Sequence, residues 1–175
     1  MKADNMASMP EQTKQAVEAF KKLSTDDQLA LFYLIYKKMG DTVTPAAPSA
    51  TDPGLTPILM GQFFELSDDE QLAGMRAIVN KEDTELSRAY GALKENNQLM
   101  VWYAWAQEMG NTGNTVIGMP NDYQATETIN GALGQIEQLE FQEQITMLRE
   151  VARDMGYSEV QPIPTQAETG KTSSL

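Results

Sequence analysis

The stretch LSTDDQLALFYLIYKKMGDT (23–42) decides the fold, because it aligns without gaps on LKENNQLMVWYAWAQEMGNT (93–112). Both stretches contain a Leu, four residues, a Gln and another Leu, and this pattern occurs four times if Ile is allowed at the end. The copies are Leu23…Gln28-Leu29, Leu66…Gln71-Leu72, Leu93…Gln98-Leu99 and Leu139…Gln144-Ile145. Copies two and four also share an Arg ten residues after the Leu, at Arg76 and Arg149. The alternation predicts one helix pair used twice, and a seam between two related halves is a natural place for a ligand cleft.

The composition excludes several function classes. The 175 residues suit one domain, with 41% hydrophobic residues and a mean hydropathy of −0.41. No apolar run approaches the length of a membrane span, and the start MKADNMASMPEQ has no apolar signal core, so we expect a cytoplasmic protein without membrane insertion. There is no Cys and no His, which removes thiolate chemistry and the commonest metal ligand. The net charge of −12 disfavours nucleic acid as a partner.

Helix boundary signals predict an all-α protein, because Val, Ile and Thr nowhere cluster in alternating strands. Thr25-Asp26-Asp27-Gln28 and Ser67-Asp68-Asp69-Glu70 have the capping-box pattern, and Gly40, Gly110, Gly113 and Gly156 mark helix ends. The expected helices cover 11–22, 25–39, 56–65, 67–79, 84–109 with a break near 94–97, 125–138 and 140–155. Pro and Gly predict a loop at 45–54. The expected organisation is an arm-like N-terminus (1–10), one helical domain (11–157) and a flexible C-terminal tail (158–175).

An aromatic stripe repeats in the two aligned stretches. Leu29, Tyr33 and Tyr36 share one helix face, and their repeat partners are Leu99, Tyr103 and Ala106. Such a stripe is either ordinary core or the wall of a ligand site. The polar tips of Tyr and Trp, the 11 Met residues and the apolar residues in the loop 116–123 favour a wall, and both interpretations stay open.

Catalytic patterns are missing from the sequence. The acidic pairs lie at expected helix starts, where carboxylates favour the helix dipole. No Ser has a His to activate it, and no phosphate loop or metal spacing is present. We therefore expect a protein that is not an enzyme and holds no metal.

Several long blocks make the sequence similar to a known family. Besides 23–42 they are the PAAP loop (45–48), NKEDTELSRAY (80–90), NNQLMVWY (96–103), MPNDY (119–123) and EQITMLREVARDMGY (143–157). From about residue 20 to 157 the chain resembles the N-terminal domain of cyanobacterial orange carotenoid proteins, and more closely the free-standing helical carotenoid proteins. The sheet-containing second domain of the two-domain proteins is not in this sequence.

The resemblance implies an all-α domain of two interleaved four-helix bundles with a pseudo-twofold repeat. It implies a keto-carotenoid of the canthaxanthin or echinenone type in a tunnel between the bundles, with Tyr36 and Trp102 stacked around one end ring. Tyr33 stands where the photoactive relative has Trp, Ala106 replaces a Gly, and the loop before Met119 is two residues longer. The implied carotenoid-binding residues are Leu29, Tyr33, Tyr36, Met75, Asn96, Leu99, Trp102, Tyr103, Ala106, Met109, Ile117, Met119, Tyr123, Ile145 and Arg149.

These observations give the hypothesis of a non-enzymatic carotenoid-binding protein in the cyanobacterial cytoplasm, near the thylakoid surface, which quenches singlet oxygen. A separate carrier that resembles the C-terminal domain is an expected partner. Direct quenching of the phycobilisome antenna is the weaker alternative, because the −12 charge repels an acidic complex although Arg149 is kept. A helical protein-interaction module and a carrier of another hydrophobe are the remaining alternatives.

Overall fold

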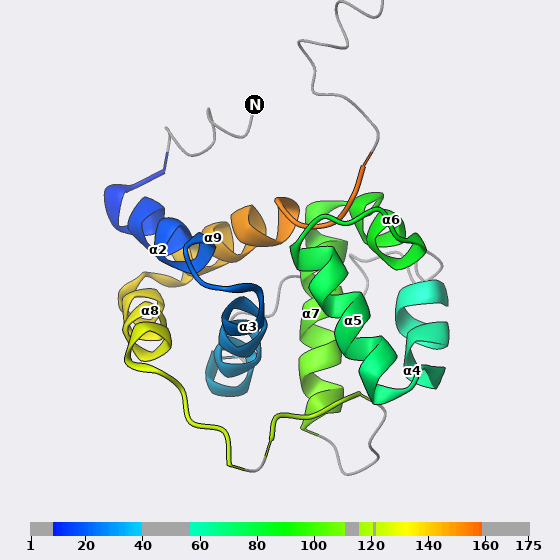
Figure 1. Ribbon diagram of the computed structural model, residues 1–175. Coiled ribbons are helices and arrows are strands. Elements are labelled where there is room, and N and C mark those ends of the chain that lie inside the picture. Colours follow the sequence, from blue (N-terminus) through cyan, green and yellow to red (C-terminus); the bar gives the residue numbers. More distant parts are fainter. Residues whose placement is uncertain (1–8, 40–56, 111–115, 121, 159–175) are drawn as a thin grey trace, which may run out of the picture.

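A computed structural model describes residues 9–39, 57–110, 116–120 and 122–158, and within these ranges every regular element is a helix (Figure 1). The all-α prediction is confirmed. The expected loop at 45–54, the helix-end glycines Gly40 and Gly113, and most of both termini lie outside the described residues. The elements are α2 (Glu11–Lys21), α3 (Thr25–Met39), a π-helix η2 (Pro57–Gln62), α4 (Phe63–Glu65), α5 (Asp68–Val79), α6 (Glu85–Gly91), α7 (Glu95–Met109), α8 (Glu127–Gln138) and α9 (Phe141–Arg153).

The helices form two interleaved bundles, as the repeat predicts. In one bundle α2 packs on α8 and α9, and α3 packs on α8; in the other, α6 packs on α5 and η2, next to α4 and α7. The first bundle is on the left of Figure 1 and the second on the right. The seam between them consists of the pairs α3 with α7, α3 with α5, and α7 with α9. The pair α3–α5 is the repeat partner of α7–α9, so the packing follows the same twofold relation as the sequence.

The repeated Leu and Gln have a shared structural role at the corner between two helices. In three copies the backbone N–H of the Leu and the side-chain amide of the Gln donate to one carbonyl oxygen at the end of the preceding helix, at 3.0 to 3.2 Å. These carbonyls belong to Phe63 for Leu66 and Gln71, to Tyr90 for Leu93 and Gln98, and to Ile136 for Leu139 and Gln144. The last carbonyls of a helix have no partner within the helix, so a buried amide that reaches them makes the corner stable.

Two helix starts differ in detail from the prediction. The helix α3 is capped by Ser24, whose Oγ accepts from the Asp27 N–H at 3.3 Å, while the Thr25 hydroxyl donates to Asn80 Oδ1 at 2.6 Å. The capping box expected at Thr25 is therefore one residue too late. The break expected at 94–97 is at 92–94, because α6 ends at Gly91 and α7 starts at Glu95. The second capping box is confirmed, with the Glu70 N–H on Ser67 Oγ at 3.2 Å.

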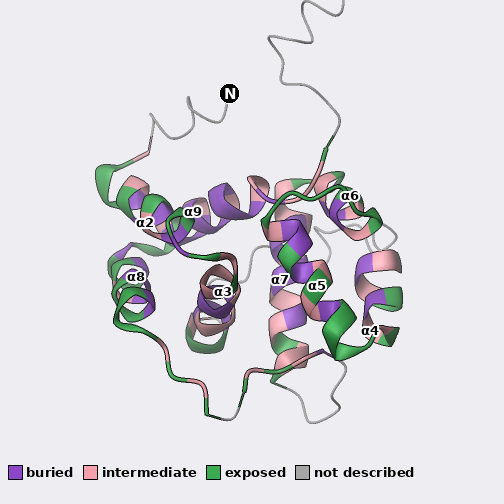
Figure 2. Ribbon diagram, in the orientation of Figure 1, coloured by how far each residue is buried: buried purple, intermediate pink, exposed green. Residues whose placement is uncertain are grey.

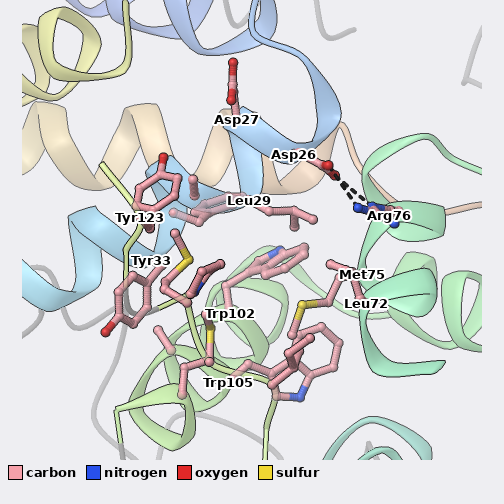
Figure 3. A pocket seen from close by; sticks show the side chains of 18 residues that line it. Asp26, Asp27, Leu29, Tyr33, Leu72, Met75, Arg76, Trp102, Trp105 and Tyr123 are labelled. Atoms are coloured by element: carbon pink, nitrogen blue, oxygen red, sulfur yellow. Dashed lines mark hydrogen bonds and ion pairs between the residues drawn. The ribbon is translucent and has the colours of Figure 1, made fainter. Parts of the chain in front are cut away.

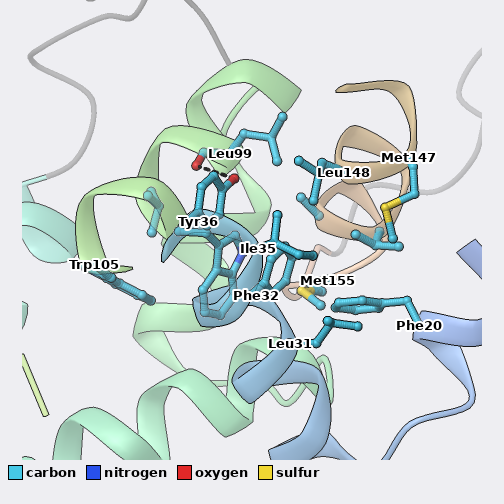
Figure 4. Packing of buried hydrophobic residues seen from close by; sticks show 14 of the residues in the cluster. Phe20, Leu31, Phe32, Ile35, Tyr36, Leu99, Trp105, Met147, Leu148 and Met155 are labelled. Carbon is cyan, nitrogen blue, oxygen red and sulfur yellow. Dashed lines mark hydrogen bonds between the residues drawn. The ribbon is translucent and has the colours of Figure 1, made fainter. Parts of the chain in front are cut away.

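The core is continuous across the seam. Phe32 of α3 and its repeat partner Trp102 of α7 stack with ring centroids 4.9 Å apart and planes at 12°. Both are almost fully buried, and Phe32 and Tyr36 lie among the aliphatic side chains of α7 and α9 in Figure 4. Figure 2 shows buried residues on the faces that the helices turn toward each other. Within the described residues no helix is long and apolar enough to cross a membrane.

The chain after α9 docks onto the second bundle. Gly156 has a φ of +82°, its N–H donates to Ile78 O at 2.8 Å, and the Tyr157 N–H donates to Ser87 O at 3.1 Å. A Cβ on Gly156 would lie 2.6 Å from Cδ1 of Tyr90 and 3.0 Å from the nitrogen of Gly91. Only Gly fits this position without strain.

Candidate binding site

An apolar cavity of about 310 Å³, called the main cavity below, lies between α3, α5, α7, residues 117–120 and Tyr123 (Figure 3). Aromatic rings and Met side chains surround it, and the ion pair of Asp26 and Arg76 lies at one edge. The lining residues are Asp26, Asp27, Leu29, Ala30, Phe32, Tyr33, Leu72, Met75, Arg76, Trp102, Trp105, Ala106, Met109, Ile117, Gly118, Met119, Pro120 and Tyr123. An apolar wall with a few polar groups at its edge is typical of a site for a hydrophobic ligand.

Helical spacing explains how three helices supply this wall. On α7, Trp102, Trp105, Ala106 and Met109 fall at i, i+3, i+4 and i+7, which places them on one face. The contributions of α3 and α5 follow the same spacing. Because these residues share one face on each helix, packing of the two bundles brings them together as one wall.

The segment 116–120 closes the cavity on a fourth side. Val116 is 3% exposed, and the Ile117 N–H donates to Oε1 of Gln71 at 2.8 Å. Gly118, Met119 and Pro120 line the cavity directly. The start of this loop is thus anchored to the core.

The predicted site residues are distributed along the seam. Nine of them line the main cavity: Leu29, Tyr33, Met75, Trp102, Ala106, Met109, Ile117, Met119 and Tyr123. A second hollow of about 570 Å³ is lined by Tyr33, Tyr36, Lys37, Ala106, Gln107 and Gly110. Because the two hollows share Tyr33 and Ala106, these two side chains stand between them.

The other predicted residues lie beyond this second hollow. The ring of Tyr103 contacts that of Tyr36 edge-on at 5.6 Å, and Leu99 and Ile145 are buried core residues. Asn96 and Arg149 line a third, polar hollow of about 640 Å³. The structure therefore brings nine predicted residues around one cavity and spreads six along the seam, and their contact with a ligand stays a prediction.

Sequence reasoning missed nine lining residues. Phe32 and Trp105 lie beside residues of the aromatic stripe in the sequence, and Ala30, Leu72, Gly118 and Pro120 gave no separate signal. Asp26 and Asp27 were interpreted as helix-start carboxylates, and Arg76 only as a repeat marker. The repeat could have indicated Asp26 and Arg76 as site residues. Asp26 is the repeat partner of Asn96, and Arg76 is the repeat partner of Arg149.

The two ends of the seam differ in charge through these repeat-related pairs. Arg76 donates to both oxygens of Asp26, at 2.7 and 2.9 Å, and the hydrogen bond from this guanidinium lowers the pKa of the carboxyl. At the other end Arg149 Nε donates to Oδ1 of Asn96 at 3.1 Å. One end of the seam therefore has the ion pair of Asp26 and Arg76, and the other end has the Arg149 cation beside the neutral amide of Asn96.

The polar tips of the buried aromatic residues are bonded within the protein. Trp102 Nε1 donates to the Tyr90 hydroxyl at 2.9 Å, and that hydroxyl donates to Ala152 O at 2.6 Å. Trp105 Nε1 donates to Leu59 O at 3.0 Å. Burial raises the pKa of Tyr90 well above its ordinary value, so this hydroxyl stays protonated. The indole rings at the cavity are therefore fixed in orientation.

The Tyr123 hydroxyl has a different environment. It is buried and has no hydrogen-bond partner among the described residues, and burial, with the nearby Asp27 charge, raises the pKa of Tyr123. Within the same residues no group of three or more acidic side chains is placed to hold a metal. The arrangement can enclose and orient an apolar molecule, and it offers no nucleophile with a base.

The fold and the cavity define a class: a helical domain with an apolar cavity, a candidate ligand site, at the seam of two interleaved bundles. The family model "Orange carotenoid protein, N-terminal" matches residues 6–158. A Nostoc sp. (strain PCC 7120) protein named orange carotenoid-binding domain-containing protein is 38% identical over 140 residues, which cover 80% of this chain and 81% of that one. The chain belongs to the family of orange carotenoid protein N-terminal domains.

Further relatives agree with this assignment. The orange carotenoid-binding protein of Synechocystis sp. is 33% identical over 81% of this chain, which spans 44% of that protein. The Red Carotenoid Protein of Anabaena (Nostoc) sp. PCC 7120 binding canthaxanthin has a TM-score of 0.73 at 34% identity, covering 83% of this chain and 99% of that one. The Orange Carotenoid Protein of the same organism binding canthaxanthin has a TM-score of 0.74 at 30% identity, covering 85% and 47%.

Proposed function

We propose that this chain binds a keto-carotenoid of the canthaxanthin type along the seam and protects against light-driven oxidation by quenching singlet oxygen. The observation that carries the proposal is the apolar cavity of about 310 Å³ at the seam, lined by aromatic and Met side chains. Family membership and the canthaxanthin-binding neighbours support it.

The size of the cavity supports a long ligand that extends past it. About 310 Å³ is near the lower limit of small-molecule pockets, so the main cavity takes one end of a long polyene. The rest continues through the second hollow, past Tyr33 and Ala106, toward Tyr36 and Tyr103. A movement of the Tyr33 side chain joins the two hollows.

The residues of the chain bind and shield the ligand. A long conjugated polyene accepts energy from singlet oxygen and releases it as heat. Met75, Met109 and Met119 adapt to an irregular apolar surface, and Trp102 and Trp105 hold fixed ring planes. Burying several hundred Å² of apolar surface at about 25 cal/mol per Å² gives on the order of 10 kcal/mol before association costs.

The partner side of the proposal rests on the third hollow. Arg149 lies there beside Asn96, and within the described residues it has no carboxylate partner. A separate carrier resembling the C-terminal domain of the two-domain relatives, with an acidic group for Arg149, is the partner that we propose for pigment exchange. Because the net charge of −12 repels an acidic antenna, we favour singlet oxygen quenching over antenna quenching.

The test is pigment binding by the full chain. The protein purified from a canthaxanthin-producing host is expected to carry polyene absorption that co-elutes with it on size exclusion. The loaded protein is expected to shorten the singlet oxygen phosphorescence lifetime of a photosensitised solution more than the unloaded protein does. A colourless product that also takes up no canthaxanthin in vitro contradicts the binding proposal, and equal lifetimes contradict the quenching proposal.

A further inference from the structure

Three of the four repeat glutamines share one bond and differ in a second, whereas Gln28 donates to Leu23 O at 3.1 Å. A primary amide has donors on its nitrogen and an acceptor on its oxygen. Gln71, Gln98 and Gln144 all use the nitrogen to donate to the end of the preceding helix, at 3.0 to 3.2 Å. This shared bond explains why Gln stands at these positions, and it leaves the amide oxygen available for another role.

Gln71 uses its oxygen to hold the cavity wall. Its Oε1 accepts the Ile117 N–H at 2.8 Å, between residues 46 positions apart, and Gln71 is 1% exposed. By contrast, Oε1 of Gln98 is buried and has no hydrogen-bond partner among the described residues. The bond to a backbone amide outside the helices therefore belongs to the copy beside the main cavity.

Among the described residues, the segment 116–120 has one backbone hydrogen bond besides that of Ile117, from the Tyr123 N–H to Pro120 O at 3.0 Å. Ile117, Gly118, Met119 and Pro120 line the cavity, and Gly118 approaches Met109 O, where an added Cβ would lie at 3.4 Å. The burial of Val116 and the bond at Ile117 fix the start of the segment, and this fixes the position of the following residues relative to α7. A buried backbone N–H without a partner is costly, and loss of the bond favours states in which the segment moves to water.

We propose that Gln71 is a positioning residue that holds residues 116–120 against the ligand and thereby sets how slowly the ligand leaves. The proposal rests on the proposed function for the identity of the ligand, but the anchoring of Ile117 exists without a ligand. One neutral hydrogen bond changes an equilibrium by about two- to tenfold. An effect of this size on release is expected when the bond is removed.

The repeat supplies a matched control. Gln71→Met and Gln144→Met each remove one side-chain bond to a helix-end carbonyl, both of 3.0 Å, and each carbonyl keeps the Leu N–H. Gln144→Met also removes the weak bond from Gln144 Nε2 to Met39 Sδ at 3.7 Å, which lies outside the main cavity. Only Gln71→Met also removes the bond to Ile117. Both full-length variants are loaded with canthaxanthin and mixed with excess phosphatidylcholine vesicles, and the loss of bound absorption is followed in time.

Gln71→Met is expected to release canthaxanthin about two- to tenfold faster than the wild type, and Gln144→Met at the wild-type rate. Equal release from the two variants overturns the proposal. Hydrogen exchange of the Ile117 amide in unloaded protein is expected to accelerate in Gln71→Met alone, and an unchanged rate also overturns it. Because exchange needs no pigment, a chain that binds no canthaxanthin refutes the proposed function while the anchoring is still tested.

If Gln71→Met does not fold, hydrogen exchange of the Ile117 amide in the wild-type protein tests whether Gln71 anchors the segment. Protection of the Ile117 amide like that of helix amides supports the anchoring, since this N–H has its partner in Gln71. Exchange at the rate of an unprotected loop amide overturns it.

Discussion

Replacing Tyr90 by Phe removes one hydroxyl that joins three helices. The hydroxyl oxygen accepts from Trp102 Nε1 at 2.9 Å, the O–H donates to Ala152 O at 2.6 Å, and Tyr90 is fully buried. Ala152 O keeps a second donor, the Met155 N–H at 3.2 Å, whereas the indole N–H of Trp102 loses its partner in the core. A buried donor left unpaired costs about 1–3 kcal/mol, and a lost neutral bond about 0.5–1.5 kcal/mol. The expected loss in the free energy of unfolding is therefore about 2–3 kcal/mol.

The matched control is Tyr36→Phe. Tyr36 is also buried, but its hydroxyl makes a single long bond of 3.4 Å to Leu99 O, so this variant is expected to lose less than about 1 kcal/mol. Urea unfolding followed by circular dichroism measures both values. At this chain length, Tyr90→Phe is expected to lower Tm by roughly 4–12 °C. A loss in Tyr90→Phe no larger than that in Tyr36→Phe would refute the reasoning that the hydroxyl bridges the helices.

Three further predictions concern the backbone, pH and the cavity. Gly156→Ala is expected to lower the free energy of unfolding by more than about 1 kcal/mol, because φ is +82° and the new Cβ would lie 2.6 Å from Tyr90 Cδ1. Gly134→Ala on α8, where a Cβ meets no atom within 4 Å, is expected to raise the free energy of unfolding by about 0.5–1 kcal/mol. Urea titrations that find Gly156→Ala at least as stable as Gly134→Ala contradict this. Burial raises the pKa of Tyr36 and Tyr90, so the free energy of unfolding is expected to fall as the pH rises above 10, by about 1.4 kcal/mol per pH unit and Tyr. Urea titrations that give a constant free energy of unfolding above pH 10 would exclude this. Ala106→Leu is expected to fill the passage between the main cavity and the second hollow, and to lower canthaxanthin loading severalfold with Tm little changed. A variant that binds as much canthaxanthin per chain as the wild type would disprove this.

The frame of the fold could be predicted because the repeat encodes it locally. The Leu and Gln of each copy lie within a few residues of the corner that they stabilise, so their spacing alone indicates the helix pairs. Capping was less certain, since Ser24 and Thr25 both fit the pattern. Asn80 decides between them by bonding the Thr25 hydroxyl from a position 55 residues away. Such a choice depends on tertiary contacts and is not written in the local sequence.

The site was predictable in its apolar part and not in its polar part. Helical spacing placed Leu29 and Tyr33 on one face, and both line the main cavity. Asp26 looked like a carboxylate at a helix start, but it also binds Arg76 from another helix. Gln71 looked like part of a repeat, and its bond to Ile117 depends on how a distant loop returns to the core. Polar partners of this kind follow from the assembled fold alone.

The interleaving of the bundles also sets an order in which the chain can fold. The bundle of η2 to α7 is contiguous between residues 57 and 109, so its contacts are local and form early. The main partners of α2 are α8 and α9, which end at Arg153, and α2 makes a smaller contact with α3 through Phe20 and Phe32. During synthesis most of the apolar face of α2, including Ala16 and Val17, therefore has no packing partner until nearly the whole domain has left the ribosome. The half that begins the chain is the last to be completed, and a ribosome-bound intermediate stalled before α8 is expected to be the species that chaperones bind.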